Sequence, residues 1–191
     1  NGGKGAGINF WAGSTGSVEN CTIVNNHSYD GTTNVCGGGI YCHSNAQLVV
    51  QNTILWGNTS GSNNSPDQVA GLPVISYSDV QGGWTNNGSG NIADNPILVE
   101  DYRLSISSPC IDAGISNSVS LDCESVPRWD APASSNTASI WDIGASEYSD
   151  ADRDGIQDWW ELRFFGNLSQ HRFNDPDGDA VENAVEYRFG S

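Results

Sequence analysis

The chain has 191 residues, with 23 acidic residues against 7 basic ones and a formal net charge of −16 at pH 7. This charge repels phosphate backbones and anionic membrane surfaces, so it excludes nucleic-acid binding and makes multivalent cations the expected partners. Seven Trp, six Tyr and five Phe indicate a packed interior, and the lack of any run of 18 apolar residues predicts no membrane span.

The first part of the chain contains an internal repeat. Ile8 aligns with Ile40 at an offset of 32, and further along Cys21 aligns with Asn52 at an offset of 31. Short runs rich in Val, Ile and Leu, separated by Gly and Asn, indicate short strands joined by turns. A repeat of this length is typical of a solenoid, in which each coil buries its apolar face against the next. Because Cys21 faces Asn52 in this alignment, we expect any ladder of stacked Asn side chains to be imperfect.

Two later segments have the same strand-like composition. Residues 73–80 and 90–99 are the candidates for a third and a fourth coil. Beyond them Tyr102, Leu104 and Ile106 alternate with other residues, which predicts a half-buried strand. We interpret the chain from there to residue 148 as a lid on the C-terminal end of the coils. Its acidic residues are expected to form turns and to lie in solvent; they are Asp112, Asp122, Asp130 and Asp142.

A series of motifs in a fixed order runs through this part of the chain. They read Gly-Gly-Ile-Tyr (38–41), Asn-Thr-Ile-Leu-Trp-Gly-Asn (52–58), Tyr-Ser-Asp-Val-Gln-Gly-Gly (77–83), Gly-Asn-Ile (90–92), Asp-Tyr-Arg-Leu (101–104), Ser-Pro-Cys-Ile-Asp-Ala-Gly (108–114) and Asp-Ile-Gly-Ala-Ser-Glu-Tyr (142–148). Over residues 5–148 this series resembles the C-terminal end of secreted bacterial right-handed parallel β-helix proteins. The resemblance implies that fold and an exported surface protein, and it implies no activity.

We therefore predict a mainly β chain with three parts. Coils of a right-handed parallel β-helix occupy residues 1–99, their closing segment occupies 100–148, and a small α-helical, calcium-binding module occupies 149–191. The chain has no Met and its repeat starts near the first residue, so we expect it to be a piece of a longer protein. An open end of coils exposes unpaired strand edges, so we expect upstream coils or a neighbouring subunit to cover the N-terminal edge.

The strongest motif begins at residue 150. Acids stand at positions 1, 3, 5, 9 and 12 of a twelve-residue loop, and Gly155 stands at position 6, which is the EF-hand pattern. Calcium takes about six to eight oxygen ligands, and alternate carboxylates of a tight loop point toward a common centre. The predicted ligands are the side chains of Asp150, Asp152, Asp154, Asp158 and Glu161 and the backbone carbonyl of Ile156.

The same spacing recurs over residues 175–186, where Ala180 replaces Gly at position 6. A Cβ at this position strains the turn, so we expect two bound Ca²⁺ ions, with the second held less tightly. The predicted ligands of this second loop are the side chains of Asp175, Asp177, Asp179, Asn183 and Glu186 and the backbone carbonyl of Val181.

Only the short segment 162–174 separates the two loops, which leaves room for one helix and a linker. Over residues 149–191 this arrangement resembles dockerin-like or thrombospondin type 3-like calcium repeats. Extracellular calcium modules bind the ion at about 10⁻⁴ to 10⁻³ M, which favours a structural role for the metal over a sensing role. We expect Trp159 and Trp160, which follow helical spacing, to form the core of this module rather than a sugar-stacking platform.

The five cysteines show no CxxC spacing, which gives no support to a zinc or thioredoxin-like motif. Cys36 with Cys42, and Cys110 with Cys123, are candidate disulfides in an oxidising compartment. The fifth, Cys21, is then a free thiol, pairs elsewhere, or acts as a small buried hydrophobe.

We predict a non-catalytic, extracellular structural or adhesive module that calcium stabilises, secreted or on a bacterial surface, with a polysaccharide or cell-surface ligand as a candidate partner. Two alternatives remain open. One is the C-terminal part of a polysaccharide-active β-helix enzyme, a lyase or glycoside hydrolase. This is disfavoured because Lys4 is the only Lys, no nucleophile or zinc-hydrolase motif occurs, and the acidic chain repels acidic glycans. The other is a dockerin-like docking or filament-forming subunit.

Overall fold

The computed structural model describes residues 5–29, 36–61, 65–128 and 140–189. Within these ranges the chain is mainly β, with two α-helices near the C-terminus, and no helix is long and apolar enough to cross a membrane. The elements in chain order are β1 (Ile8–Phe10), β2 (Thr15–Glu19), β3 (Thr22–Val24), β4 (His27–Ser28), β5 (Ile40–Cys42), β6 (Gln47–Gln51), β7 (Ile54–Trp56), β8 (Thr59–Ser60), β9 (Ser65–Pro66), β10 (Val69–Ala70), β11 (Val74–Ser76), β12 (Asp79–Val80), the 3₁₀-helix η1 (Glu100–Tyr102), α1 (Asp158–Phe164) and α2 (Asn183–Phe189).

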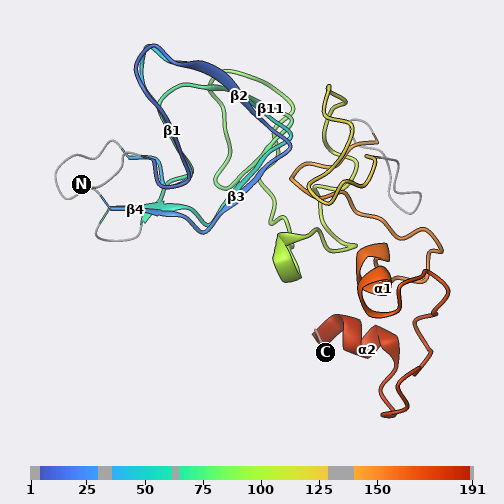
Figure 1. Ribbon diagram of the computed structural model, residues 1–191. Helices are drawn as coiled ribbons and strands as arrows, with labels where there is room; N and C mark the ends of the chain where they lie inside the picture. Colours follow the sequence, from blue (N-terminus) through green and yellow to red (C-terminus); the bar gives the residue numbers. More distant parts are fainter. Residues whose placement is uncertain (1–4, 30–35, 62–64, 129–139, 190–191) are drawn as a thin grey trace.

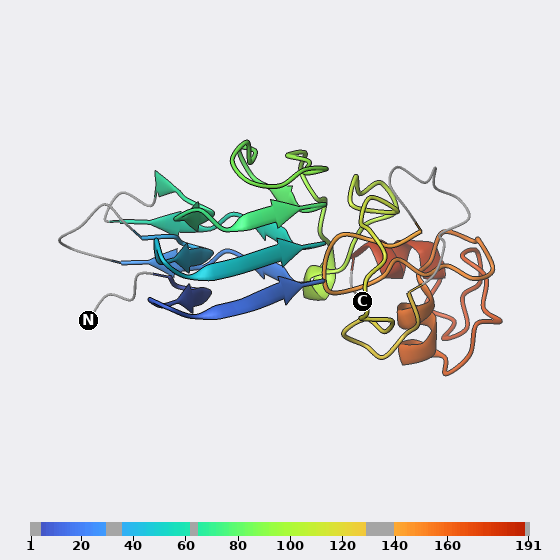
Figure 2. The same cartoon turned by 90° about the horizontal axis from the view of Figure 1, so that it is seen from above.

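Successive repeats of the chain pair strand on strand in parallel. The sheets have the orders β1-β5-β10, β2-β6-β11, β3-β7-β12 and β4-β8-β9, and β9 alone among these runs antiparallel to its neighbour. Figure 1 looks along the stack, so that strands of successive repeats overlap, and Figure 2 shows them lying one above another. The predicted parallel β architecture is confirmed at this level.

The register between the first two repeats is the same in all four of their strand pairs. Ile8 pairs with Ile40 and Thr22 pairs with Ile54, so the expected change to an offset of 31 is wrong. The consequence is an Asn ladder that the alignment missed. Asn20 lies beside Asn52, and the Asn52 side-chain amide donates a 2.9 Å hydrogen bond to Asn20 Oδ1. Both have φ of 49°, a left-handed conformation that Asn tolerates better than most residues.

The strands bury side chains on two faces. Leu55 of β7 lies in the interior of the stack, whereas its neighbour Ile54 faces outward into a second cluster, because successive side chains of a strand alternate. The interior cluster consists of Val18, Ile23, Ile40, Cys42, Leu48, Val50, Leu55, Ile75 and Val80. The outer cluster consists of Ile54, Leu104, Cys110, Ile111, Ala113, Ile143 and Tyr148.

The third and fourth predicted coils differ. Residues 73–80 form the strands β11 and β12 as expected, but residues 90–99 form no strand and contribute isolated bridges such as Ile92 to Asp79. Residues 87–92 nevertheless run along the free edge of the third repeat. The Ile75 amide donates to the Asn87 carbonyl at 2.9 Å, and the Val80 amide donates to the Ile92 carbonyl at 3.0 Å. This edge of the stack is therefore covered along β11 and β12.

The described parts of the closing segment, 100–128 and 140–148, lie beside the strands, against the outer face of β7, and not across an end of the stack (Figures 1 and 2). The predicted half-buried strand does not form there. Leu104 is 2% exposed and packs in the outer cluster, but Tyr102 and Ile106 are 54% and 56% exposed. One anchoring Leu in an irregular path thus replaces the strand that the alternation predicted.

Several acids of this segment lie in the interior, which corrects the expectation that they sit in solvent. Asp142 is 1% exposed, and its two oxygens accept hydrogen bonds from the amides of Asp112, at 2.8 Å, and Tyr148, at 2.6 Å. Arg128 donates to the buried Glu147 carboxylate at 2.7 Å. Burial raises the pKa of both Asp142 and Glu147.

Asp122 confirms the turn-forming prediction, since its Oδ1 accepts from the amides of Glu124, at 2.8 Å, and Val126, at 2.9 Å. Asp130 lies outside the described residues.

None of the five cysteines, all of which lie in the described ranges, forms a disulfide bond. The structure therefore does not show the predicted pairs Cys36–Cys42 and Cys110–Cys123. Cys110 is fully buried and its thiol donates to Asp79 Oδ2 at 3.4 Å, while Cys123 is exposed. Cys42 packs in the interior cluster instead of bridging to Cys36.

Candidate metal centre

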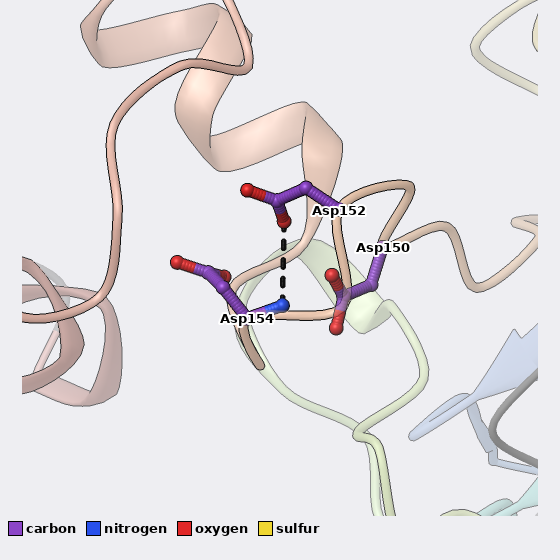
Figure 3. Close-up of side chains that lie close together, drawn as sticks. All are labelled: Asp150, Asp152 and Asp154. Carbon is purple, nitrogen blue, oxygen red and sulfur yellow. Dashed lines mark hydrogen bonds between the residues drawn. The ribbon is translucent and has the colours of Figure 1, made fainter.

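The first acidic loop, residues 150–161, has a tightly bonded backbone. The Gly155 amide donates to Asp150 Oδ2 at 3.1 Å, and the Ile156 amide donates to Asp154 Oδ1 at 2.8 Å. The Asp154 amide donates to Asp152 Oδ1 at 3.3 Å, the contact drawn in Figure 3. Gly155 has φ of 91°, a conformation that side chains resist, which explains Gly at position 6.

Three carboxylates converge in this loop. Asp150, Asp152 and Asp154 each offer one oxygen, and these oxygens lie within 4.8 Å of one another (Figure 3). The sequence prediction that alternate Asp residues of the loop come together is confirmed. Carboxylates this close repel one another unless a cation or protons neutralise them.

Glu161 supplies a second, independent observation at the first loop. It lies in α1 at position 12 of the loop and is 0% exposed, and neither carboxylate oxygen has a hydrogen-bond partner in the described structure. Burial, followed by the charges of the four loop Asp residues, raises its pKa to about 7. A buried carboxylate with no donor is costly, and a divalent ion among the loop oxygens would supply the missing partner. The residues present therefore fit a calcium ion.

Asp158, the predicted ligand at position 9, has a different local role. Its Oδ1 accepts the Ala151 amide at 2.8 Å and its Oδ2 accepts the Ser149 hydroxyl, so it ties the start of α1 to the start of the loop. Position 9 of such loops often reaches the metal through a water molecule, so this placement is compatible with the motif. Ile156, whose carbonyl is the predicted ligand at position 7, buries its side chain.

The second loop, residues 175–186, repeats the same backbone path. The Ala180 amide donates to Asp175 Oδ2 at 2.9 Å, and the Val181 amide donates to Asp179 Oδ1 at 2.8 Å. Oxygens of Asp175, Asp177 and Asp179 again lie within 4.8 Å of one another, but all three residues are exposed. Ala180 has φ of 73°, so the strain predicted at position 6 is present.

The remaining predicted ligands of the second loop lie on α2. Asn183 is 0% exposed; its Nδ2 donates to the His171 carbonyl at 3.1 Å, and its Oδ1 is buried without a partner among the described residues. Glu186 is half-buried, and burial together with the charges of Asp177 and Asp179 raises its pKa. The second loop thus has the same pattern of residues as the first, but its three Asp carboxylates are exposed to solvent.

An aromatic core joins α1 to α2. Trp160 is 1% exposed, and its ring centre lies 4.8 Å from that of Phe164 and 5.8 Å from that of Tyr187. The core assignment of Trp160 is confirmed. Trp159 is half-buried and packs under the Arg103 guanidinium, whose Cζ is 4.0 Å from the ring centre. The Trp159 ring therefore packs against the closing segment.

Gln157 was not identified from the sequence. It is 1% exposed, and its Nε2 donates to the Leu104 carbonyl at 2.7 Å while its Oε1 accepts the Trp159 indole N–H at 3.0 Å. The first loop is therefore anchored to the closing segment. No local pattern indicates that an amide between two loop positions will be buried by a segment so distant in the sequence.

Comparisons with protein-family models, with curated proteins and with solved structures find no match to the chain. The site is therefore interpreted from its own residues: oxygen-only donors, closely spaced carboxylates and a buried Glu. This donor set suits a hard divalent ion, and the loop pattern is the one that binds calcium.

Proposed function

We propose that this chain is a non-catalytic, extracellular structural or adhesive module whose C-terminal tail calcium stabilises. In this proposal the parallel sheets are the last coils of a right-handed β-helix, and the protein is secreted or lies on a bacterial surface. The constant register between the first two repeats supports stacked coils, since coils of equal length produce a fixed offset. The net charge of −16 supports a cation-rich, extracellular setting.

The observation that carries the proposal is the Glu161 carboxylate. It is 0% exposed, both of its oxygens lack partners within the described ranges, and Asp150, Asp152 and Asp154 of the same loop crowd their own oxygens within 4.8 Å. Convergence of carboxylates alone does not decide the matter, because the exposed Asp175, Asp177 and Asp179 of the second loop also lie within 4.8 Å of one another. The Glu161 oxygens are not among those that lie within 4.8 Å of one another, but the charges of the loop Asp residues raise its pKa. A divalent ion held by the loop would offset the cost of burying this Glu there.

Calcium removal tests the proposal. At about 1 mM calcium and the affinity usual for extracellular modules, each ion adds about 0.4 to 1.4 kcal/mol to stability. We expect a chelator to lower the melting temperature by a few degrees and to speed amide exchange first in residues 149–191. Exchange in strands β5 to β7 is expected to change little. Unchanged melting and exchange would contradict the proposal.

The control separates binding from charge screening. Sodium at the ionic strength of the added calcium screens the acidic tail, but its single charge attracts the clustered carboxylates of a loop far less than the double charge of calcium. Calcium added back after chelation should restore melting and exchange, and sodium should not. Equal restoration by both would mean that the acidic loops need only screening.

The N-terminal edge of the stack supports the partner that this proposal includes. Strands β1, β2, β3 and β4 are each the last strand of their sheet, so one side of each presents backbone groups without a neighbouring strand. Such edges favour pairing with another strand. At the opposite edge, residues 87–92 cover β11 and β12, which disfavours head-to-tail stacking of copies. We therefore propose upstream coils or a neighbouring subunit as the cover; a stable monomer in sedimentation would count against this.

A further inference from the structure

The linker between the two acidic loops contacts the first loop at Arg172. The Arg172 amide donates to Asp154 Oδ2 at 2.5 Å, and its guanidinium Nη1 donates to the Asp154 carbonyl at 3.0 Å. Asp154 is one of the three carboxylates that converge in the first loop. A linker residue well beyond the first loop in the sequence is therefore held by a predicted metal ligand.

The same short stretch also holds the second loop. The Arg172 carbonyl accepts the Ala184 amide at 2.9 Å, and the carbonyl of the preceding His171 accepts the Asn183 side-chain amide at 3.1 Å. Asn183 is the predicted ligand at position 9 of the second loop. Residues 171–172 thus connect Asp154 of one loop to Asn183 and Ala184 of the other.

The second loop lacks the linker contact at the equivalent position. Asp179, the equivalent of Asp154, likewise accepts a hydrogen bond at Oδ1 within its own loop, from Val181, but no linker amide among the described residues donates to its Oδ2. On its other side the first loop is fixed to the closing segment through Gln157 and Leu104. The first loop is thus anchored at both flanks, and the second loop depends on the linker that the first one holds.

We propose that Arg172 couples the two metal loops, so that a calcium ion in the first loop raises the affinity of the second. This inference rests on the proposed function, because it requires both loops to bind calcium. Without an ion, repulsion between Asp150, Asp152, Asp154 and Glu161 opens the first loop and releases Arg172. The second loop must then order residues 171–174 as well as itself when it binds. An ion in the first loop removes that ordering cost in advance, which is positive coupling.

Calorimetric titration of the whole chain with calcium measures this coupling. Glu161→Gln disables the first loop, and we expect the affinity of the second loop to fall about fivefold or more, the lower end of usual coupling. Arg172→Pro removes the linking N–H, and in that background Glu161→Gln should no longer change the second loop. Arg172→Ala keeps the N–H and should retain most of the coupling.

A second measurement does not depend on the proline variant folding correctly. In a chain whose second loop is disabled by Asp175→Asn, calcium should slow exchange of the Arg172 amide and also of the Ala184 amide. Slowing at Arg172 without any slowing at Ala184 would overturn the inference. If the two sites bind calcium independently, the coupling inference fails and the proposed function stands. If the chain binds no calcium, both the coupling inference and the proposed function fail.

Discussion

Carboxylates are buried both in the strand-rich body, residues 5–148, and in the C-terminal tail, residues 149–189. The groups that surround these carboxylates differ between the two regions. In the body, Glu147 has Arg128 as a partner at 2.7 Å, and Asp79 has the Cys110 thiol at 3.4 Å. In the tail, Glu161 is equally buried, but its oxygens have no hydrogen-bond partner among the described residues, and the charges that act on it are those of loop Asp residues. Burial alone therefore does not indicate a metal. The indication comes from a buried acid that has no donor and feels the charges of other acids.

Asp79 shows what burial does to an acid that has no cation nearby. It is 0% exposed on β12, and burial raises its pKa from 3.8 to about 7, with a smaller raising effect from Asp94. A single acid of this kind can be neutralised by one proton. Glu161 differs because four Asp charges act on it. One proton would neutralise Glu161 itself but would leave the repulsion among those Asp residues in place.

The largest expected effect is on the pH dependence of stability, and it comes from replacing Asp79, which a proton neutralises in the folded protein. A folded-state pKa of about 7 against 3.8 means that the native state binds the extra proton between these values. Stability should therefore fall as pH rises from about 4 to about 7, by at most about 4 kcal/mol. Asp79→Asn should remove the Asp79 share of this slope, while Asp142 and Glu147, whose pKa values burial also raises, keep the remainder. Urea unfolding at pH 5 and pH 8, with calcium saturating so that the tail stays constant, measures it.

The contradicting outcome would be an unchanged slope in Asp79→Asn. Asp94→Asn is the matched control, because Asp94 is exposed and its charge is only a small contributor to the Asp79 pKa. It should leave most of the slope in place.

The next effect separates the two position-12 glutamates of the tail. Glu161→Gln removes a buried charge but keeps a buried polar group, so at pH 8 it should stabilise the calcium-free chain by at most about 3 kcal/mol, the value that a pKa raised from 4.5 to about 7 allows. It should also reduce the melting shift that calcium produces. Glu186→Gln, at a half-buried position, should barely change the calcium-free melting temperature. If Glu161→Gln and Glu186→Gln change the melting temperature equally in the presence of a chelator, the proposed difference in burial between the two loops is contradicted.

The smallest effect concerns strain in the second loop. Ala180 has φ of 73°, and Ala180→Gly should relieve part of the strain, with a net gain of about 0.5 kcal/mol because Gly is freer in the unfolded chain. Gly178→Ala is the opposite test: its φ is 79° and an added Cβ would meet nothing within 4 Å. The calcium affinity of the second loop should rise in the first variant and fall in the second; changes of the reverse sign would contradict the assignment.

Sequence repetition predicted the parallel strands and both acidic loops, because these features are set by local spacing. The prediction of the register was wrong where two identical residues were aligned that the fold does not pair. Matching Thr22 to Thr53 suggested an offset of 31, but the backbone pairs Thr22 with Ile54, since Ile23 and Leu55 must share the interior. The missed ladder of Asn20 and Asn52 follows from that single shift.

The segment after the strands was less predictable, because its burial depends on a distant surface. Leu104 is buried by the outer face of β7, centred on Ile54, and nothing near Leu104 in the sequence reveals that face. The same holds for the site: spacing indicated which acids converge, but not that Glu161 would lose all contact with water or that Arg172 would join the loops.

A crystal structure grown in calcium tests the central claim most directly. We predict density for an ion about 2.3 to 2.6 Å from oxygens of Asp150, Asp152, Asp154 and Glu161, with a second ion in the exposed loop. A map from calcium-grown crystals with no ion in the first loop, and with the Glu161 carboxylate still lacking a partner, would contradict it.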